Sequence, residues 1–239
     1  MSSRRTVEAT ILGALLCLGL ALLGIFLANG VLKTKELGRT VTVKGLSEQE
    51  VPADIAIWPI SFSEADNDLS KLYSAVESKT GIIVSFLKKH GFTDDEITIS
   101  APSIIDRQAS RYDSSQSIKY RYTGKSTVSI YSLKVELVRS TMNKLVDLGK
   151  QGIAIGGEDY ETKTQFLFTK LNDIKPKMIE EATKNAREVA EKFAKDSNSK
   201  LGKIYRAQQG QFSIEERDKN TPHIKKIRIV STIEYYLTD

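Results

Sequence analysis

The hydrophobic positions are distributed unevenly along the chain, and the first long run of them carries no charge. From Ala9 to Leu32 there are 24 consecutive uncharged residues, of which only Thr10 and Asn29 are clearly polar. As a helix this run would be about 36 Å long, which is enough to cross a hydrocarbon core of roughly 30 Å. The pattern predicts one transmembrane helix, with an apolar surface that includes Leu12, Leu15, Leu16, Leu20, Leu23 and Phe26.

The residues around this run indicate its orientation. Arg4 and Arg5 precede it and a polar body follows it, which is the order of an export signal. We therefore expect a retained signal-anchor over residues 1–32, a juxtamembrane linker over residues 33–39 and an extracytoplasmic domain over residues 40–239. Cleavage of the signal and release of the body is the alternative, because Ala28 to Gly30 offers a partial small-residue cleavage site.

Within the body, the pattern changes several times between the period of a strand and that of a helix. The run over residues 51–63 changes phase at Trp58 and Pro59, which predicts a bulge in an edge strand. By alternation, strands are predicted over residues 41–43, 51–63, 96–105, 118–138, 160–168, 201–209 and 224–237.

Three-four spacing of apolar residues predicts the helices. A helix over residues 69–90 is expected to begin at Asn67 or Asp68 as N-cap and to end at Gly91. A short helix is expected to begin at Ser140. The longest one follows Asn172 or Asp173, and its apolar stripe comprises Ile174, Met178, Ala182, Ala186, Val189, Phe193 and Ala194. The interspersed order predicts an α+β fold, with a mainly antiparallel sheet packed against two long helices and one short helix.

Three segments of the body carry a family resemblance. They are Val41 to Phe62, with Gly45, Pro52 and Asp54; Asp95 to Thr98; and the helix Ala182 to Ala194 followed by Leu201 to Ile204. In this order and spacing the chain resembles the SIMPL family from about Thr40 to Tyr236. Ala53 separates Pro52 from Asp54, which the family commonly has adjacent.

The resemblance to the SIMPL family implies a bacterial cell-envelope protein. Its members are exported or membrane-anchored, which places this chain in the cytoplasmic (inner) membrane as a single-pass protein with a periplasmic body. Signal cleavage would instead secrete the body to the periplasm. The resemblance also implies an association with stress protection and a tendency to form homo-oligomers, and it implies no established catalytic residues.

Composition narrows the chemistry further. The net charge of +5, from 35 basic and 30 acidic residues, is too small and too mixed to require nucleic acid as a partner. One Cys and two His exclude a disulfide framework and a structural zinc site. His90 and His223 are interpreted as surface residues, and no catalytic motif surrounds any serine. We therefore expect no catalytic residue, cofactor or metal. A hydrolase built from Asp54, a serine and either histidine remains an alternative.

One cluster interleaves positive charge with aromatic rings and is a candidate interaction surface. It comprises Arg111, Tyr112, Tyr120, Arg121, Tyr122 and Lys125. Such a surface suits anionic envelope polymers or lipid headgroups. A solvated β-hairpin, with tyrosines facing the sheet or a neighbouring subunit, explains the same pattern.

Two functional hypotheses follow from these observations. The first is a non-enzymatic, membrane-anchored envelope protein that self-assembles into a homo-oligomer. The alternative is a monomeric extracytoplasmic binding or scaffold module for an anionic envelope ligand.

Overall fold

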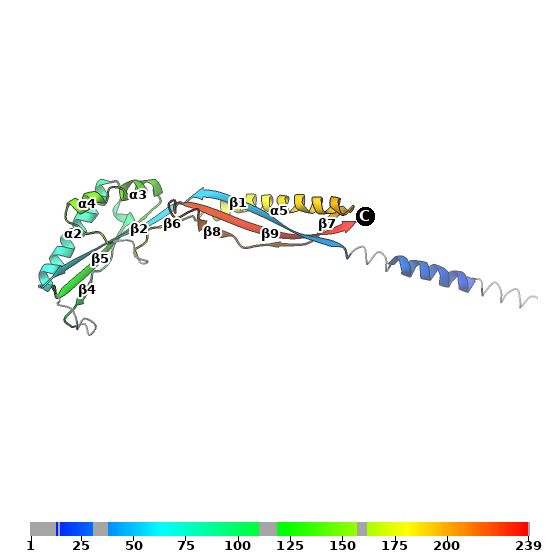
Figure 1. Ribbon diagram of the computed structural model, residues 1–239, viewed down its shortest axis with the longest axis horizontal. Helices are drawn as coiled ribbons and strands as arrows, with labels where there is room; N and C mark the ends of the chain where they lie inside the picture. The colour runs from blue at the N-terminus through cyan, green and yellow to red at the C-terminus, as the bar shows by residue number, and fades with distance from the viewer. Residues whose placement is uncertain (1–12, 14, 31–37, 110–118, 157–161, 239) are drawn as a thin grey trace, which may run out of the picture. The chain divides into compact units, whose positions relative to one another are not determined.

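The computed structural model describes residues 13, 15–30, 38–109, 119–156 and 162–238, which divide into two compact units (Figure 1). Unit 1 consists of Met1–Glu48, Ile174–Ser213 and Arg228–Asp239. Unit 2 consists of Gln49–Asp173 and Ile214–Ile227. The fold is α+β with antiparallel sheets, as the sequence predicts.

The strands and helices alternate along the chain. The strands are β1 Thr40–Pro52, β2 Ile55–Asp66, β3 Ile97–Ile99, β4 Ser103–Asp106, β5 Tyr122–Ser132, β6 Gln165–Leu167, β7 Lys200–Gln209, β8 Ser213–Glu216 and β9 Ile224–Thr238. The helices are α2 Leu69–Lys89, the 3₁₀ turn η1 Asp94–Glu96, α3 Val135–Met142, α4 Val146–Lys150 and α5 Leu171–Asp196.

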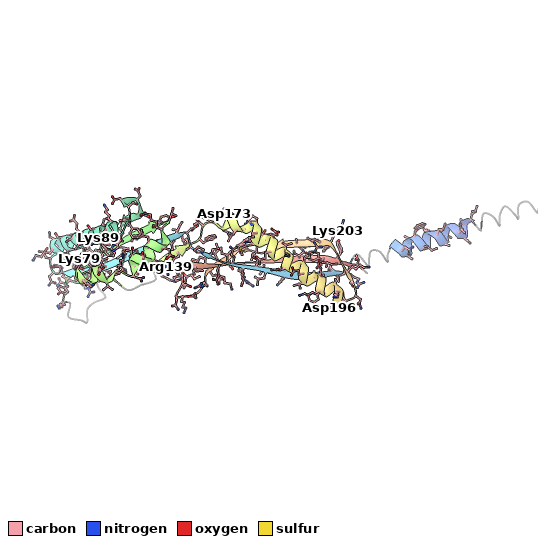
Figure 2. All side chains as sticks on the ribbon, turned by 90° about the horizontal axis from the view of Figure 1, so that it is seen from above. Lys79, Lys89, Arg139, Asp173, Asp196 and Lys203 are labelled. Carbon is pink, nitrogen blue, oxygen red and sulfur yellow. The ribbon has the colours of Figure 1, made fainter. Side chains whose placement is uncertain are left out.

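In unit 1 a sheet with strand order β1-β9-β7 packs against α5, and β8 pairs with β9 (Figure 1). Asp173 and Asp196, labelled in Figure 2, lie close to the two ends of α5. The buried side chains of α5 recur at every fourth residue and are Met178, Ala182, Ala186, Ala190 and Ala194. The four alanines are small, so the helix can lie close to the sheet.

Gly45 of β1 lies directly against the backbone of α5. A Cβ atom at Gly45 would overlap the carbonyl oxygen of Ala182 and lie 2.5 Å from the backbone nitrogen of Ala186. Only glycine leaves room for the helix here. The predicted stripe of α5 is wrong at Val189 and Phe193, which are 37% and 56% exposed, because the buried line repeats every four residues.

In unit 2 a second sheet has the strand order β3-β5-β2-β6, and β4 also pairs with β5. Pairing between β2 and β5 runs without a shift from Ala56↔Ser132 to Asp66↔Tyr122. The predicted bulge at Trp58 and Pro59 is therefore wrong, and β2 lies between two other strands. Its core-facing positions are Ala56, Trp58, Ile60 and Phe62, in one unbroken phase. β6 pairs only with Ile55, Ala56 and Ile57, so Pro59 lies beyond the end of that ladder and its missing amide is tolerated.

The core of unit 2 lies between this sheet and α2, α3 and α4. α2 contributes Leu72, Ile83 and Leu87, all completely buried. Its N-cap is Asp68, whose side chain accepts hydrogen bonds from the backbone N–H groups of Ser70 and Lys71 at 2.8 and 3.1 Å. Gly91 follows the helix with φ of 97°. The predicted start and stop of this helix are both confirmed.

The structure corrects the predicted elements that follow. β5 ends at Ser132, whose Oγ accepts a hydrogen bond from the Lys134 backbone nitrogen at 3.0 Å, and α3 begins at Val135. Ser140 lies inside α3 and donates to the Leu137 carbonyl oxygen, so it is not an N-cap. The predicted single short helix is two helices, α3 and α4. The predicted strand over residues 96–105 is divided into β3 and β4, and β6 is shorter than predicted.

The predicted transmembrane segment is described only in part. Residues 15–30 are helical, whereas residues 9–12, 14, 31 and 32 lie outside the described residues, as does most of the linker at residues 33–37. In the part of the chain that the structure describes, no helix has both the length and the apolarity needed to cross a membrane. The transmembrane helix stays a prediction.

Candidate functional site

The interaction surface predicted from the sequence lies at the start of β5. Arg111 and Tyr112 are outside the described residues. The guanidinium of Arg121 donates to Oδ2 of Asp106 at 2.9 Å from Nη2 and 3.2 Å from Nε, and to Oδ1 at 3.3 Å from Nε. It also lies 4.8 Å from the ring centroid of Tyr122. The Arg121 hydrogen bond lowers the pKa of Asp106. The carboxylate of Asp106 therefore offsets the positive charge of Arg121.

The tyrosines of this surface are placed differently from each other. Tyr122 packs against the core of unit 2, as the hairpin interpretation expects. Tyr120 is 41% exposed, and the ammonium group of Lys119 lies 5.4 Å from its ring centroid. Lys125 pairs with Ser63 of β2 and Ser103 of β4 in the sheet. The surface stays a prediction, with less free positive charge at Arg121 than the sequence alone suggests.

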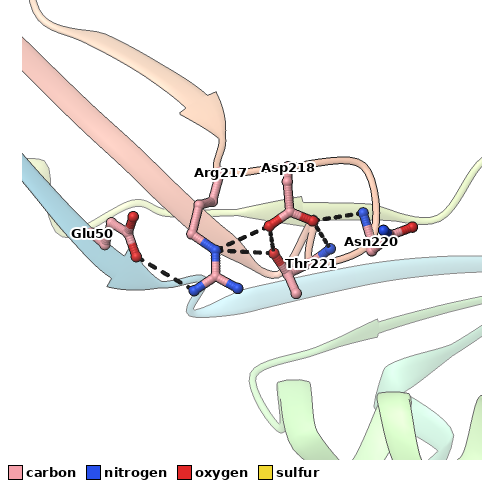
Figure 3. A network of polar contacts seen from close by, with 5 residues as sticks. All are labelled: Glu50, Arg217, Asp218, Asn220 and Thr221. Atoms are coloured by element: carbon pink, nitrogen blue, oxygen red, sulfur yellow. Dashed lines mark hydrogen bonds and ion pairs between the residues drawn. The ribbon is translucent and has the colours of Figure 1, made fainter.

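A second group of polar residues gathers in the loop between β8 and β9 (Figure 3). Arg217 donates to Glu50 at 3.4 Å, to Asp218 at 3.0 Å and to the Thr221 hydroxyl at 3.2 Å. The carboxylate of Asp218 also accepts from the backbone nitrogens of Asn220 and Thr221, each at 2.8 Å. Hydrogen bonds from the Thr221 hydroxyl and then Arg217 lower the pKa of Asp218 to about 2. The loop is thus fixed by contacts within it and to Glu50.

Next to this loop, one carboxylate lies between two lysines. Lys225 of β9 is only 7% exposed, and its Nζ lies 3.7 Å from an oxygen of Glu216. The Nζ of Lys163 lies 3.7 Å from the other oxygen of Glu216. Burial lowers the pKa of Lys225, and the charge of Glu216 opposes that shift. Glu216 is thus the shared counter-ion of Lys163 and Lys225.

His223 is buried, which corrects its interpretation as a surface residue. It is 9% exposed, its ring is edge-on to Phe166 with 6.0 Å between ring centroids, and its carbonyl oxygen accepts from the Ala53 backbone nitrogen. Burial lowers the pKa of His223, and the positive charge of Arg139 lowers it further, while Glu136 opposes the shift. The imidazole is therefore neutral at pH 7.

Two neighbouring pockets open beside the loop, and we call them together the loop pocket. Their volumes are about 340 and 190 Å³, and both are lined by Met142, Phe166 and Pro222. The other lining residues are polar: Lys163, Thr164, Glu216 and Lys219 in the first pocket, and Arg139, Asn143, Asn220 and His223 in the second. An apolar floor with basic groups around it can hold an anion attached to an apolar group.

The sequence did not indicate the loop pocket, because its residues come from three separate segments of the chain. Each segment reads locally as an ordinary helix end, short strand or polar loop. The one signal in the sequence is His223 beside Pro222, but a histidine in a polar stretch is more typical of a surface loop. The hydrolase alternative gains no support, since Asp54 accepts hydrogen bonds from the backbone nitrogen and hydroxyl of Thr169.

The described residues contain no group of three or more His, Cys, Asp or Glu side chains placed to hold a metal ion.

Comparison with protein-family models gives a match over most of the chain. A family model named SIMPL, described as a protein of unknown function (DUF541), matches residues 41–226. This confirms the resemblance inferred from the sequence motifs. The comparison with curated proteins finds no match. The matched range contains every residue that lines the loop pocket.

Proposed function

The chain belongs to the SIMPL family, and from this premise we propose that it is a non-enzymatic, membrane-anchored cell-envelope protein whose body assembles with copies of itself. Residues 1–32 anchor it in the cytoplasmic membrane, residues 33–39 form the linker and residues 40–239 lie in the periplasm. The link to stress protection comes from the family resemblance alone. The family description names no function, so the support comes from two surfaces of the protein.

The first surface is the amino-terminal helix. Over residues 15–30 it carries nine large apolar side chains that are between 47% and 73% exposed, namely Leu15, Leu16, Leu18, Leu20, Leu22, Leu23, Ile25, Phe26 and Leu27. A helix that is apolar on all sides does not suit contact with water. Exposed apolar area of this extent marks a membrane or protein contact, and lipid covers every side of a helix at once.

The second surface carries the proposal of self-assembly, and it is the edge strand β7. β7 is the last strand of its sheet among the described residues, and none of its ten residues is buried. A free edge presents backbone N–H and C=O groups that can pair with another strand. Ile204 and Tyr205 add apolar area at 49% and 56% exposure. Anchoring concentrates copies in two dimensions, which favours this pairing.

A double variant of β7 tests the assembly. We expect Ile204→Glu with Tyr205→Glu to raise the dissociation constant of the assembly about tenfold or more, because like charges then face each other across the edge. The measurement is sedimentation of the full-length chain in neutral detergent over a dilution series.

The matched control replaces two exposed apolar residues of unit 2, Leu133→Glu with Val146→Glu, which are 72% and 68% exposed in the wild type. This control should associate as the wild type does. If the β7 variant, the control and the wild type associate equally, the proposal that copies associate through β7 is wrong.

A further inference from the structure

We propose that the loop pocket binds a small organic anion, in which a carboxylate or phosphate group is attached to an apolar body. The inference does not depend on self-assembly, since every residue it uses belongs to unit 2.

The charges around the first pocket favour an anion. Lys163 and Lys219 line it, and Lys225 lies 3.7 Å from the lining residue Glu216, which is the one acidic residue among the described residues that line the two pockets. Lys219 forms no ion pair with any described residue. Lys163 and Lys225 share the single carboxylate of Glu216, so these four described side chains carry a net charge of about +2. Hydrogen bonds between such groups and an anion are stronger than neutral ones.

Three other acidic residues near the pocket, all in the described part of the chain, already have partners. Asp218, the neighbour of Lys219 in sequence, accepts hydrogen bonds from Arg217, Thr221 and two backbone nitrogens. Glu50 pairs with Arg217. Glu136 accepts two bonds from Arg139 at 3.0 and 2.9 Å. These three carboxylates therefore bind their own partners and do not neutralise the lysines of the pocket.

The floor of the pocket suits an apolar body. Met142, Phe166 and Pro222 line both parts, and Phe166 is 5% exposed with its ring against the neutral His223. A volume of about 340 Å³ is at the lower end of the range for ligand sites, which limits the ligand to a small molecule. An inorganic ion would leave this apolar surface unused.

The buried Lys225 positions the carboxylate of Glu216 at the pocket. Its ammonium group fixes Glu216 from behind, and the other oxygen of Glu216 faces Lys163 at 3.7 Å. The Lys163 side chain lines the pocket and is 55% exposed, so its ammonium group can be reached from solvent. An anion that enters can take over the Lys163 ammonium, while Glu216 remains paired with Lys225.

Calorimetric titration of the full-length chain in neutral detergent tests the site, with phenyl phosphate as the probe. We expect phenyl phosphate to bind at least tenfold more tightly than inorganic phosphate and than benzyl alcohol, which lacks the charge. Lys163→Gln with Lys219→Gln should weaken binding about tenfold or more. Lys71→Gln with Lys184→Gln, two exposed lysines that do not line the pocket, should leave it unchanged.

A variant that is expected to bind more tightly distinguishes a specific binding site from a general loss of folded structure. Glu216→Gln removes the carboxylate that competes with the ligand for Lys163, while the new amide oxygen can still accept a hydrogen bond from Lys225, so phenyl phosphate binding should tighten several-fold. Circular dichroism checks that each variant is folded. Binding that is unchanged in the double lysine variant, or absent in the wild type at millimolar phenyl phosphate, would overturn the proposal. Equal affinity for inorganic and phenyl phosphate would overturn the apolar part of it.

Discussion

Replacing Gly45 by alanine is expected to destabilise unit 1 by about 3 kcal/mol or more. The added methyl group would overlap the carbonyl oxygen of Ala182 and lie 2.5 Å from the backbone nitrogen of Ala186. Both atoms belong to the backbone of α5, so no side-chain rotation relieves the overlap. The helix must move away from β1, and the contacts of Ala186 and Ala190 with the sheet are lost.

Chemical denaturation of the full-length chain measures the loss of unfolding free energy. Hydrogen exchange at the amides of α5, measured on the folded protein, shows whether the loss is located in this helix. Gly81→Ala is the control, because Gly81 lies within α2 and a Cβ atom there meets nothing within 4 Å. That substitution should stabilise by about 0.5 to 1 kcal/mol, since alanine is the better helix former. Unchanged exchange of α5 in Gly45→Ala would contradict the packing described for unit 1.

The second large effect is expected from acid, through Glu96 of η1. Its carboxylate accepts hydrogen bonds from the hydroxyl of Ser132 at 2.6 Å, from the Thr93 backbone nitrogen at 3.0 Å and from the ammonium of Lys134 at 3.2 Å. Burial raises the pKa of Glu96, but these bonds together outweigh it and lower the pKa from 4.5 to about 2. The folded protein thus favours the charged form.

The sign of the pH dependence follows from this lowered pKa. The stabilisation is fully present above pH 4.5 and is lost as the pH falls toward 2. The shift corresponds to roughly 3 kcal/mol of unfolding free energy, because the Glu96 side chain is only 16% exposed and weakly screened.

Denaturation midpoints measured between pH 7 and pH 2 test the role of Glu96. Glu96→Gln should be much less stable than the wild type at pH 7, and the difference should shrink steadily below pH 4. Glu77→Gln, at an exposed position of α2, should differ from the wild type by the same small amount throughout. A stability difference for Glu96→Gln that does not change with pH would contradict the role of the charge.

The sequence predicted those parts of the fold in which one periodicity dominates. In α2, the three-four spacing, the Asp68 cap and Gly91 all agree, so the helix and both ends were predictable. β9 alternates over its whole length, with its buried residues at every second position. By contrast, the apolar residues between positions 133 and 138 fit both the alternation of a strand and the three-four spacing of a helix. Their helical structure depends on the burial of Val135 and Val138 in the folded protein.

The register of β2 and the packing at Gly45 illustrate what a linear pattern cannot contain. Apolar residues occupy both faces of the first part of β2, so the phase of the core-facing residues Ala56 and Trp58 was hidden by Ile55 and Ile57. Gly45 was noticed as part of a family motif, but its physical reason is the helix at Ala182, more than 130 positions further along the chain.

The loop pocket was unpredictable for a related reason. Lys163, Glu216 and Lys225 are polar residues in segments whose pairing no local period specifies. The cationic surface at Arg121 was predicted from residues that are close in sequence. That proximity does not show that Arg121 forms an ion pair with Asp106.

One measurement tests the central proposal, an anchored protein that assembles with itself, most directly. Membranes from cells that produce the full-length chain are washed with alkaline carbonate, and the retained protein is extracted in neutral detergent and sedimented over a wide dilution series. We predict that the chain stays with the membrane and sediments with a protein mass that is a multiple of 26.6 kDa. A chain released by the wash that sediments as a single copy at every concentration would contradict the proposal.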